Sequence, residues 1–151
     1  MRDGTPKGYA ILKIEDNQYS FDYKVVDKPA SYQIDLYGAS VIPEKYTKRY
    51  PIYANFFIGK EGDKVRFRIN QGEWKEMDFV NENDPAFLNS LAKYDTATEL
   101  KNTRRPSNPE KSSHLWAANL PKLKAGKYQI EVQAIDLFNR VHAATKTIEV
   151  R

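Results

Sequence analysis

Apolar and polar side chains alternate in three separate parts of the chain. Segment 8–25 predicts a hairpin, because two runs in which every second residue is apolar flank a turn at Asp16-Asn17. Residues 64–69 and 127–134 alternate in the same way. Segment 52–59 is mostly apolar, which is typical of a strand that is buried on both faces. Because side chains on a strand point to its two faces in turn, this pattern predicts a set of short strands around a shared interior.

Turn-forming residues separate these segments at the spacing expected of a β-sandwich. About eight or nine short strands predict a mainly β fold, a two-layer antiparallel β-sandwich. One short helix is expected after Asp84, which can cap its first turn, with Pro85 at the first helical position. Segment 95–113 is polar and predicts a long loop, which is uncommon in a compact domain and is usually functional or disordered.

The C-terminal part resembles the last two strands of immunoglobulin-like and fibronectin-like modules. Tyr128 is placed to donate a hydrogen bond back to the backbone near Leu123. In the last strand, the apolar residues fall on odd-numbered positions near Val141 and on even-numbered positions near Ile148. This shift predicts a β-bulge, because one extra residue exchanges the two faces of a strand. We expect His142 to lie on a solvent-facing side of this strand.

Composition narrows the possible classes of function. The chain has 151 residues, enough for one domain with a core, and we assign residues 1–151 to a single domain. Its formal net charge of +4 comes from Lys and Arg scattered among acidic residues, so we expect no nucleic-acid partner. No apolar run predicts a membrane span. Cysteine is absent, which excludes disulfides, Cys-zinc sites and thiol nucleophiles.

The few side chains that could support catalysis do not form a recognisable site. His114 and His142 each stand alone, outside any metal-binding motif, so we expect no metal and no cofactor in this chain. Ser112-Ser113-His114 suggests a nucleophile beside a base, but adjacent residues on an extended chain point to opposite faces, so we expect no nucleophile–base dyad. The sequence therefore predicts no catalytic residue and no independent enzyme activity.

Binding is a more open question. Arg104 and Arg105 lie in the polar loop near Lys101, where they can meet a phosphate or an acidic partner surface; the alternative is a loop kept solvated by its charge. Trp116 is expected in the core, with a stacking platform for a sugar as the alternative. Trp74 follows a turn and is the better candidate for exposure.

Three short motifs occur in order along the chain: Asp-Gly-Thr-Pro at residues 3–6, Asp84-Pro85 before the expected helix, and His114-Leu115-Trp116 followed by Leu-Pro. They are the most specific pieces of a pattern that resembles the C-terminal domain of bacterial calcineurin-like phosphoesterases. Their shared order covers nearly the whole chain. Tyr128 departs from the family pattern, which often has His there, and Asn139 stands where the family often has Gly. Asn tolerates the left-handed backbone that such a turn needs.

The resemblance implies that the chain is the C-terminal part of a longer, exported bacterial phosphoesterase, in the periplasm or at the cell surface. Catalytic residues and divalent metals would belong to the preceding domain, with Asp3–Pro6 as the linker from it. The chain would then be a non-catalytic accessory domain that docks on the catalytic domain of the same polypeptide and shapes its substrate cleft. The expected contact region comprises the loop 95–113, the helix after Asp84 and the strand start at 114–116.

Six residues are expected to take part in binding or docking: His114, Trp116, Asp84, Arg104, Arg105 and Trp74. One alternative is a free-standing carbohydrate-binding or protein-interaction module that uses Trp74 and surface tyrosines, and a fully buried Trp74 would count against it. Another is an independent enzyme, which activity of the isolated chain on phosphoesters with added divalent metal would support.

Overall fold

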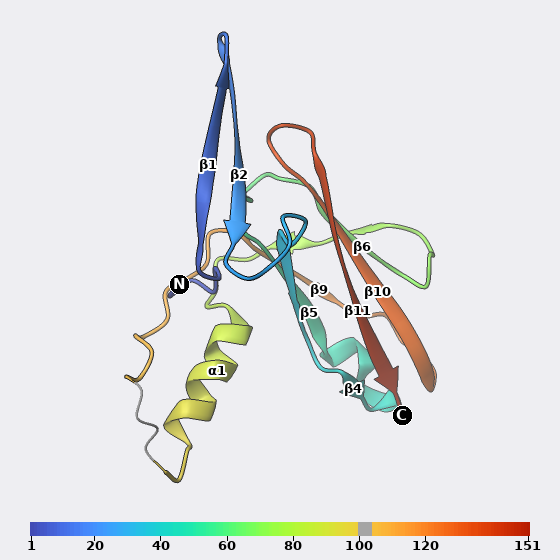
Figure 1. Cartoon of the computed structure of the whole chain (residues 1–151). Coiled ribbons are helices and arrows are strands. Elements are labelled where there is room, and N and C mark those ends of the chain that lie inside the picture. Colours follow the sequence, from blue (N-terminus) through green and yellow to red (C-terminus); the bar gives the residue numbers. More distant parts are fainter. Residues whose placement is uncertain (100–103) are drawn as a thin grey trace.

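The described residues, 1–99 and 104–151 of a computed structural model, form eleven strands, one α-helix and one 3-10 helix (Figure 1). In chain order the elements are β1 (Gly8–Glu15), β2 (Gln18–Val25), β3 (Ile34–Tyr37), β4 (Val41–Ile42), η1 (Glu44–Arg49), β5 (Pro51–Phe56), β6 (Val65–Ile69), β7 (Lys75–Glu76), β8 (Asp78–Phe79), α1 (Pro85–Asp95), β9 (Leu115–Asn119), β10 (Gly126–Ile135) and β11 (Val141–Val150).

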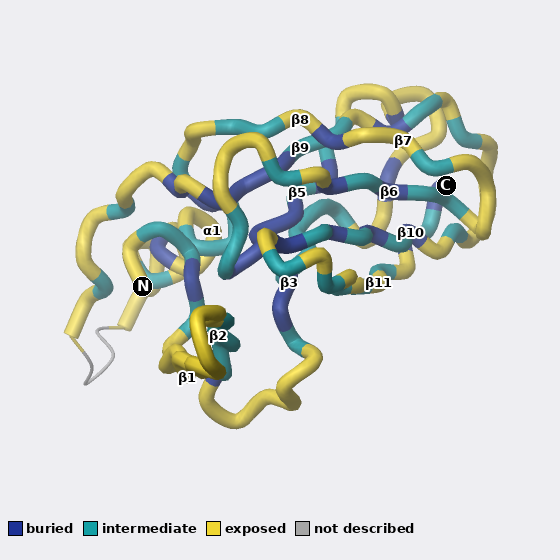
Figure 2. Tube along the Cα trace, turned by 90° about the horizontal axis from the view of Figure 1, so that it is seen from above, coloured by how far each residue is buried: buried dark blue, intermediate teal, exposed yellow. Residues whose placement is uncertain are grey.

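Two of the sheets pack face to face and confirm the predicted two-layer sandwich. One has the strand order β4-β11-β10-β6-β7 and the other the order β3-β5-β9-β8. Their pairings are antiparallel except for the short parallel pairing of β4 with β11. The buried residues follow the facing strands (Figure 2), and the largest of them include Trp116, Phe56, Ile34, Ile130, Ile148, Val65 and Val132.

Several local predictions are confirmed. Asp84 caps α1 by accepting a hydrogen bond from the Phe87 backbone N–H at 2.8 Å, and Pro85 occupies the first helical position. The Tyr128 hydroxyl donates to the carbonyl of Lys124 at 3.0 Å, next to the predicted position. Asn139 has a φ of 60°, the left-handed conformation that the last turn requires.

The predicted bulge in the last strand is wrong. The pairing of β10 with β11 runs without interruption from Gly126↔Val150 to Ile135↔Val141. Alternation from the buried Ile148 and Val150 therefore places Val141 outside and His142 on the inner side, so the expected solvent-facing position of His142 is also wrong.

The segment that follows the turn at residues 70–72 is divided between the two sheets. Asn70 and Gln71 both have positive φ, and Gly72 closes this turn with a hydrogen bond to the carbonyl of Ile69. β7 then pairs with β6, whereas β8 crosses to pair with β9. Buried Met77 lies between them, at the change of sheet.

The predicted N-terminal hairpin is confirmed, but it lies outside the sandwich. β1 and β2 pair with each other over eight positions and form a two-stranded sheet of their own. The hairpin projects away from the two larger sheets (Figure 1), and every residue of β1 is exposed.

Candidate functional site

The N-terminal segment before β1 is bound to the sandwich through a buried polar cluster. The hydroxyl of Thr5, which is 4% exposed, lies 2.9 Å from Nε2 of His114. Oδ2 of Asp3 lies 3.4 Å from the same nitrogen, and Oδ1 of Asp3 accepts from the Thr5 backbone N–H at 3.0 Å. The segment is thus fixed by a side chain that lies 109 residues further along the chain.

The other side of the imidazole ring is bound to the core strand β5. Nδ1 of His114 lies 2.7 Å from Oδ1 of Asn55, and Nδ2 of Asn55 donates to Oδ2 of Asp84 at 2.9 Å. Because the amide NH2 group faces Asp84, Oδ1 is the atom that accepts from His114, and Nδ1 carries a proton. Nε2, on the other side of the ring, faces the hydroxyl of Thr5 and Oδ2 of Asp3.

Asp84 joins this cluster to the start of α1. Its side chain is buried and accepts from both Asn55 and the Phe87 backbone N–H. Gly4 passes so close that a Cβ there would collide with the Asp84 side chain, and its φ is +89°. We call Asp3, Gly4, Thr5, Asn55, Asp84 and His114 the N-terminal clasp.

Ser112 also approaches His114, and the opposite-face argument for neighbouring residues applies only to Ser113. Residues two apart on an extended chain share a face, and the Ser112 hydroxyl lies 3.3 Å from Nδ1 of His114. Ser112 is fully buried, so its hydroxyl faces the protein interior rather than a surface that a substrate could reach. The contact of Ser112 therefore helps to hold the His114 ring within the clasp.

The carboxyl group of Asp3 is held in its ionised form. Burial raises the pKa of Asp3, but hydrogen bonds from the backbone and side chain of Thr5 and from His114 outweigh this effect, and the pKa lies below its ordinary value. The clasp therefore contains a carboxylate whose hydrogen bonds depend on its charge.

The polar segment after α1 lies beside the clasp. Arg105 forms a bidentate ion pair with Asp95 at the end of α1, with N–O distances of 2.6 and 2.8 Å. Arg2 contacts the carbonyl of Asn108 and pairs with Glu110 at 2.9 Å. Arg104 is exposed. Lys101 lies outside the described residues.

The six predicted binding residues therefore fall into two groups. Asp84 and His114 belong to the clasp, and Trp116 is buried two residues after His114, against Phe56 and Phe79. Arg104, Arg105 and Trp74 lie nearer the surface. The structure does not test binding by any of the six, and their role in docking stays a prediction.

Trp74 is half-buried and lies among cationic groups. The guanidinium carbons of Arg66 and Arg68 lie 4.7 and 4.5 Å from the Trp74 ring centroid. These cation–π contacts engage the aromatic surface that a sugar would need for stacking. They do not favour the carbohydrate-binding alternative.

A second buried charged group holds the hairpin. Asp136 accepts from Arg140 Nε at 2.7 Å and lies 3.0 Å from Nε2 of His142. Arg140 also pairs with Asp22 and donates to the carbonyl of Phe21 at 2.7 Å. Arg140 thus links the β10–β11 turn to β2 of the hairpin.

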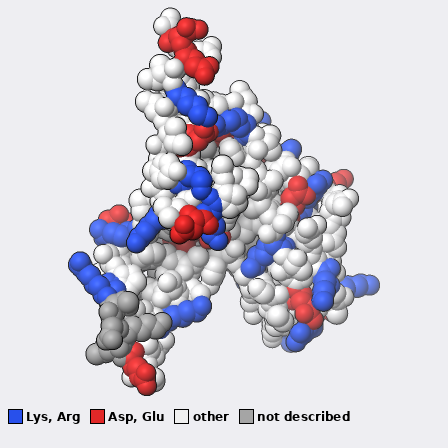
Figure 3. Space-filling view, in the orientation of Figure 1, with Lys and Arg blue, Asp and Glu red and all other residues white. Residues whose placement is uncertain are grey.

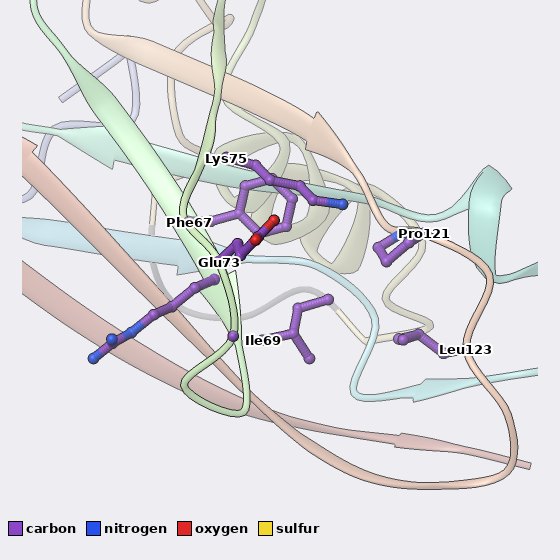
Figure 4. Close-up of a pocket in the computed structure, with 8 residues that line it drawn as sticks. Phe67, Ile69, Glu73, Lys75, Pro121 and Leu123 are labelled. Atoms are coloured by element: carbon purple, nitrogen blue, oxygen red, sulfur yellow. The ribbon is translucent and has the colours of Figure 1, made fainter.

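A shallow pocket of about 290 Å³ lies near the β6–β7 turn (Figure 4). Phe67, Ile69, Pro121 and Leu123 give it an apolar lining, with Glu73 and Lys75 beside them. It contains neither a histidine nor a member of the clasp. Its position and lining do not indicate a catalytic site.

The described part of the chain does not fit the metals that the resemblance implies. No group of three or more His, Cys, Asp or Glu side chains suited to a metal occurs in residues 1–99 and 104–151. Both ring nitrogens of His114 contact protein atoms, and Nε2 of His142 contacts Asp136. That the metals are held by the catalytic domain stays a prediction.

Fold and clasp together define the class of this protein: a β-sandwich domain that binds its own N-terminal segment in a buried polar cluster. The family model described as C terminal of Calcineurin-like phosphoesterase matches residues 1–142, and the chain belongs to this family. The resemblance indicated by the motifs is therefore confirmed. No curated protein and no solved structure matches the chain.

Proposed function

We propose that this chain is a non-catalytic accessory domain that docks on the catalytic domain of a metal-dependent phosphoesterase in the same polypeptide. In this proposal it also forms one wall of the substrate cleft. The observation that carries the proposal is the N-terminal clasp. It binds the segment that would connect the two domains, and it does so with buried hydrogen bonds.

A fixed connection restricts the position of the domain before it. A flexible Gly/Ser-rich linker would leave two domains free to reorient. Here the Thr5 side chain is bound to His114, and the Tyr23 hydroxyl donates to the carbonyl of Pro6 at 2.6 Å. A domain attached before Asp3 would therefore leave the sandwich in one direction, which favours a defined contact between the two domains.

The contacts of the histidines support an accessory role. His114 holds the clasp, and His142 binds the buried carboxylate of Asp136 with its ring against Phe56. Ser112 is fully buried beside His114. Since these side chains already have internal roles, we place the reaction and its divalent metals in the catalytic domain.

We also infer that the parent protein is exported to the periplasm or the cell surface. This inference rests on the family resemblance. In residues 1–99 and 104–151, no helix has the length and apolar character needed to cross a membrane. Fractionation of the source cells, followed by immunodetection with an antibody to this domain, tests the location.

The proposed function is tested by supplying the domain separately. The catalytic domain, truncated before Asp3, is assayed for phosphoesterase activity with and without residues 1–151, and binding is measured by isothermal titration calorimetry. We expect saturable binding and a change in kcat/KM. If the two parts do not bind and activity stays unchanged, the accessory role is wrong.

A further inference from the structure

The β1–β2 hairpin has an apolar face that the sandwich covers only in part, through ring contacts of Phe138 and Phe57. Ala10, Leu12 and Ile14 of β1 lie opposite Tyr23, Phe21 and Tyr19 of β2, and directly opposed residues share a face of the sheet. Leu12 is 60%, Ile14 69% and Tyr19 62% exposed. These cross-strand pairs contain no charged side chain, so the outer half of this face is a continuous apolar surface.

The opposite face of the hairpin has a different character. Lys13 forms an ion pair with Asp22 there at 2.6 Å, and Ser20 and Lys24 lie on the same side, together with the exposed Tyr9 and Ile11 near the base. Charged side chains are visible along the hairpin, with acidic ones at its tip (Figure 3). The hairpin is therefore amphipathic, although an isolated two-stranded sheet is at best marginally stable in water.

The hairpin is nevertheless held in one orientation. Arg140 binds Asp22 and the carbonyl of Phe21, and the Phe138 ring packs edge-on against Phe21 with centroids 5.3 Å apart. Tyr23 at the base of the hairpin packs against Phe57 of the sandwich. These contacts present the apolar face in a fixed position, which reduces the entropy lost when a partner binds.

We propose that this apolar face docks on the phosphoesterase catalytic domain of the same polypeptide. The proposal rests on the proposed function, and it identifies the surface of this domain that makes the contact. A rigid, exposed apolar patch of this kind marks an interaction site in soluble proteins.

The position of the N-terminal segment selects the occupant. The N-terminus lies at the base of the hairpin (Figure 1), where the carbonyl of Lys7 accepts from the Val26 backbone N–H at 3.0 Å. A domain attached before Asp3 is therefore tethered at the base of the hairpin, at a high effective concentration relative to it. A second copy of this chain would lack that advantage.

The test uses residues 1–151 and the separately expressed catalytic domain. We expect the double variant Leu12→Lys/Ile14→Lys to bind the catalytic domain at least tenfold more weakly than the natural chain in isothermal titration calorimetry. Both side chains are mostly exposed, so lysine is accommodated in the free domain, and circular dichroism with thermal unfolding verifies the fold.

Val41→Lys is the matched control, because Val41 is 50% exposed on β4, which lies apart from the hairpin (Figure 1). The control is expected to bind unchanged.

The outcomes separate the two proposals. If the natural chain does not bind the catalytic domain, the proposed function itself fails. If the natural chain binds and the double variant binds equally well, the accessory role stands and the hairpin assignment is overturned. If light scattering shows that the natural chain dimerises and that the double variant only loses this dimerisation, the occupant is a second copy, and the assignment is again overturned.

Discussion

Gly4 lies where two constraints on the backbone coincide. Its φ of +89° is in the region that favours glycine, and its Cα faces the Asp84 side chain at a distance that leaves no room for a Cβ. Asp84 in turn is fixed by the α1 cap and by Asn55. The clasp therefore depends on glycine at this position for conformation and for space.

Substituting Gly4 should separate these two effects. We expect Gly4→Ala to lower the free energy of unfolding by about 2–4 kcal/mol. The alanine would strain the backbone at positive φ, and its Cβ would also collide with the buried side chain of Asp84. Gly62→Ala is the matched control, since Gly62 has a φ of +95° but open space around it, and we expect it to cost about 1 kcal/mol. Urea unfolding measures both, and equal losses would show that the close approach to Asp84 contributes nothing.

The members of the clasp differ in how far the sequence identifies them. Asp84 is recognisable as a helix cap, and His114 belongs to a motif. Thr5 and Asn55 are not recognisable as its partners, because 109 and 59 residues separate them from His114. Ser112 stands in the Ser112-Ser113-His114 motif, and its contact with His114 is consistent with the rule that residues two apart on an extended chain share a face. Local patterns thus identify candidate side chains, whereas only the tertiary fold determines which of them meet.

At the scale of elements, alternation predicts strands well where the apolar contrast is strong. Val65 and Phe67 on β6 are buried as expected, and so are Ile130 and Val132 on β10. Residues 143–147 of β11 are small or polar, so their sequence does not indicate which of them face the core. Pairing with β10 sets the register there, and the predicted bulge was wrong for that reason.

The hairpin shows what alternation alone does not reveal. Its strands were predicted correctly, yet an amphipathic pattern does not say which element covers the apolar face. Here the polar contact between hairpin and sandwich includes Arg140, whose guanidinium group reaches Asp136, Asp22 and the carbonyl of Phe21. Ring contacts of Phe138 and Phe57 with the hairpin act beside it.

Replacing Arg140 by lysine should release the hairpin while leaving the sandwich folded. Lysine keeps the charge but cannot bind three acceptors in the planar geometry of the guanidinium group. We expect amides of β2 to exchange with solvent about tenfold faster in Arg140→Lys, as measured by hydrogen exchange and NMR. Arg68→Lys is the control, because Arg68 pairs with Glu131 within the sandwich. Unchanged exchange in β2 would show that aromatic packing alone holds the hairpin.

For the whole molecule, the carboxylates that hold the N-terminal segment and the hairpin make the stability of the fold depend on pH. Asp3 lies in the clasp, Asp22 binds Lys13 and Arg140, and Asp136 joins Arg140 to His142. Hydrogen bonds from Lys13 and Arg140 lower the pKa of Asp22, against a smaller effect of burial. Burial raises the pKa of Asp136, but hydrogen bonds from His142 and Arg140 outweigh it, and this pKa is lowered as well.

The sign of the resulting pH dependence follows from these shifts. A carboxyl whose pKa is depressed in the folded state contributes stability above its unfolded pKa and loses this contribution as the pH falls through the folded value. The ordinary value is 3.8, so the loss should begin near pH 4 to 5 and continue below it. Acid should therefore weaken the junctions that hold the N-terminal segment and the hairpin.

Asp136→Asn tests this link between acid sensitivity and the buried junction. We expect the substitution to lower the free energy of unfolding by about 1–3 kcal/mol at pH 7, because Arg140 and His142 lose a charged acceptor whose side chain is only 1% exposed. The difference from the natural chain should shrink as the pH falls from 5 to about 2, since protonation removes the same charge from Asp136. Urea unfolding across this range measures it, with Asp78→Asn, at an exposed residue of β8, as the control. A difference that stays constant or grows towards low pH would show that Asp136 does not carry the acid sensitivity.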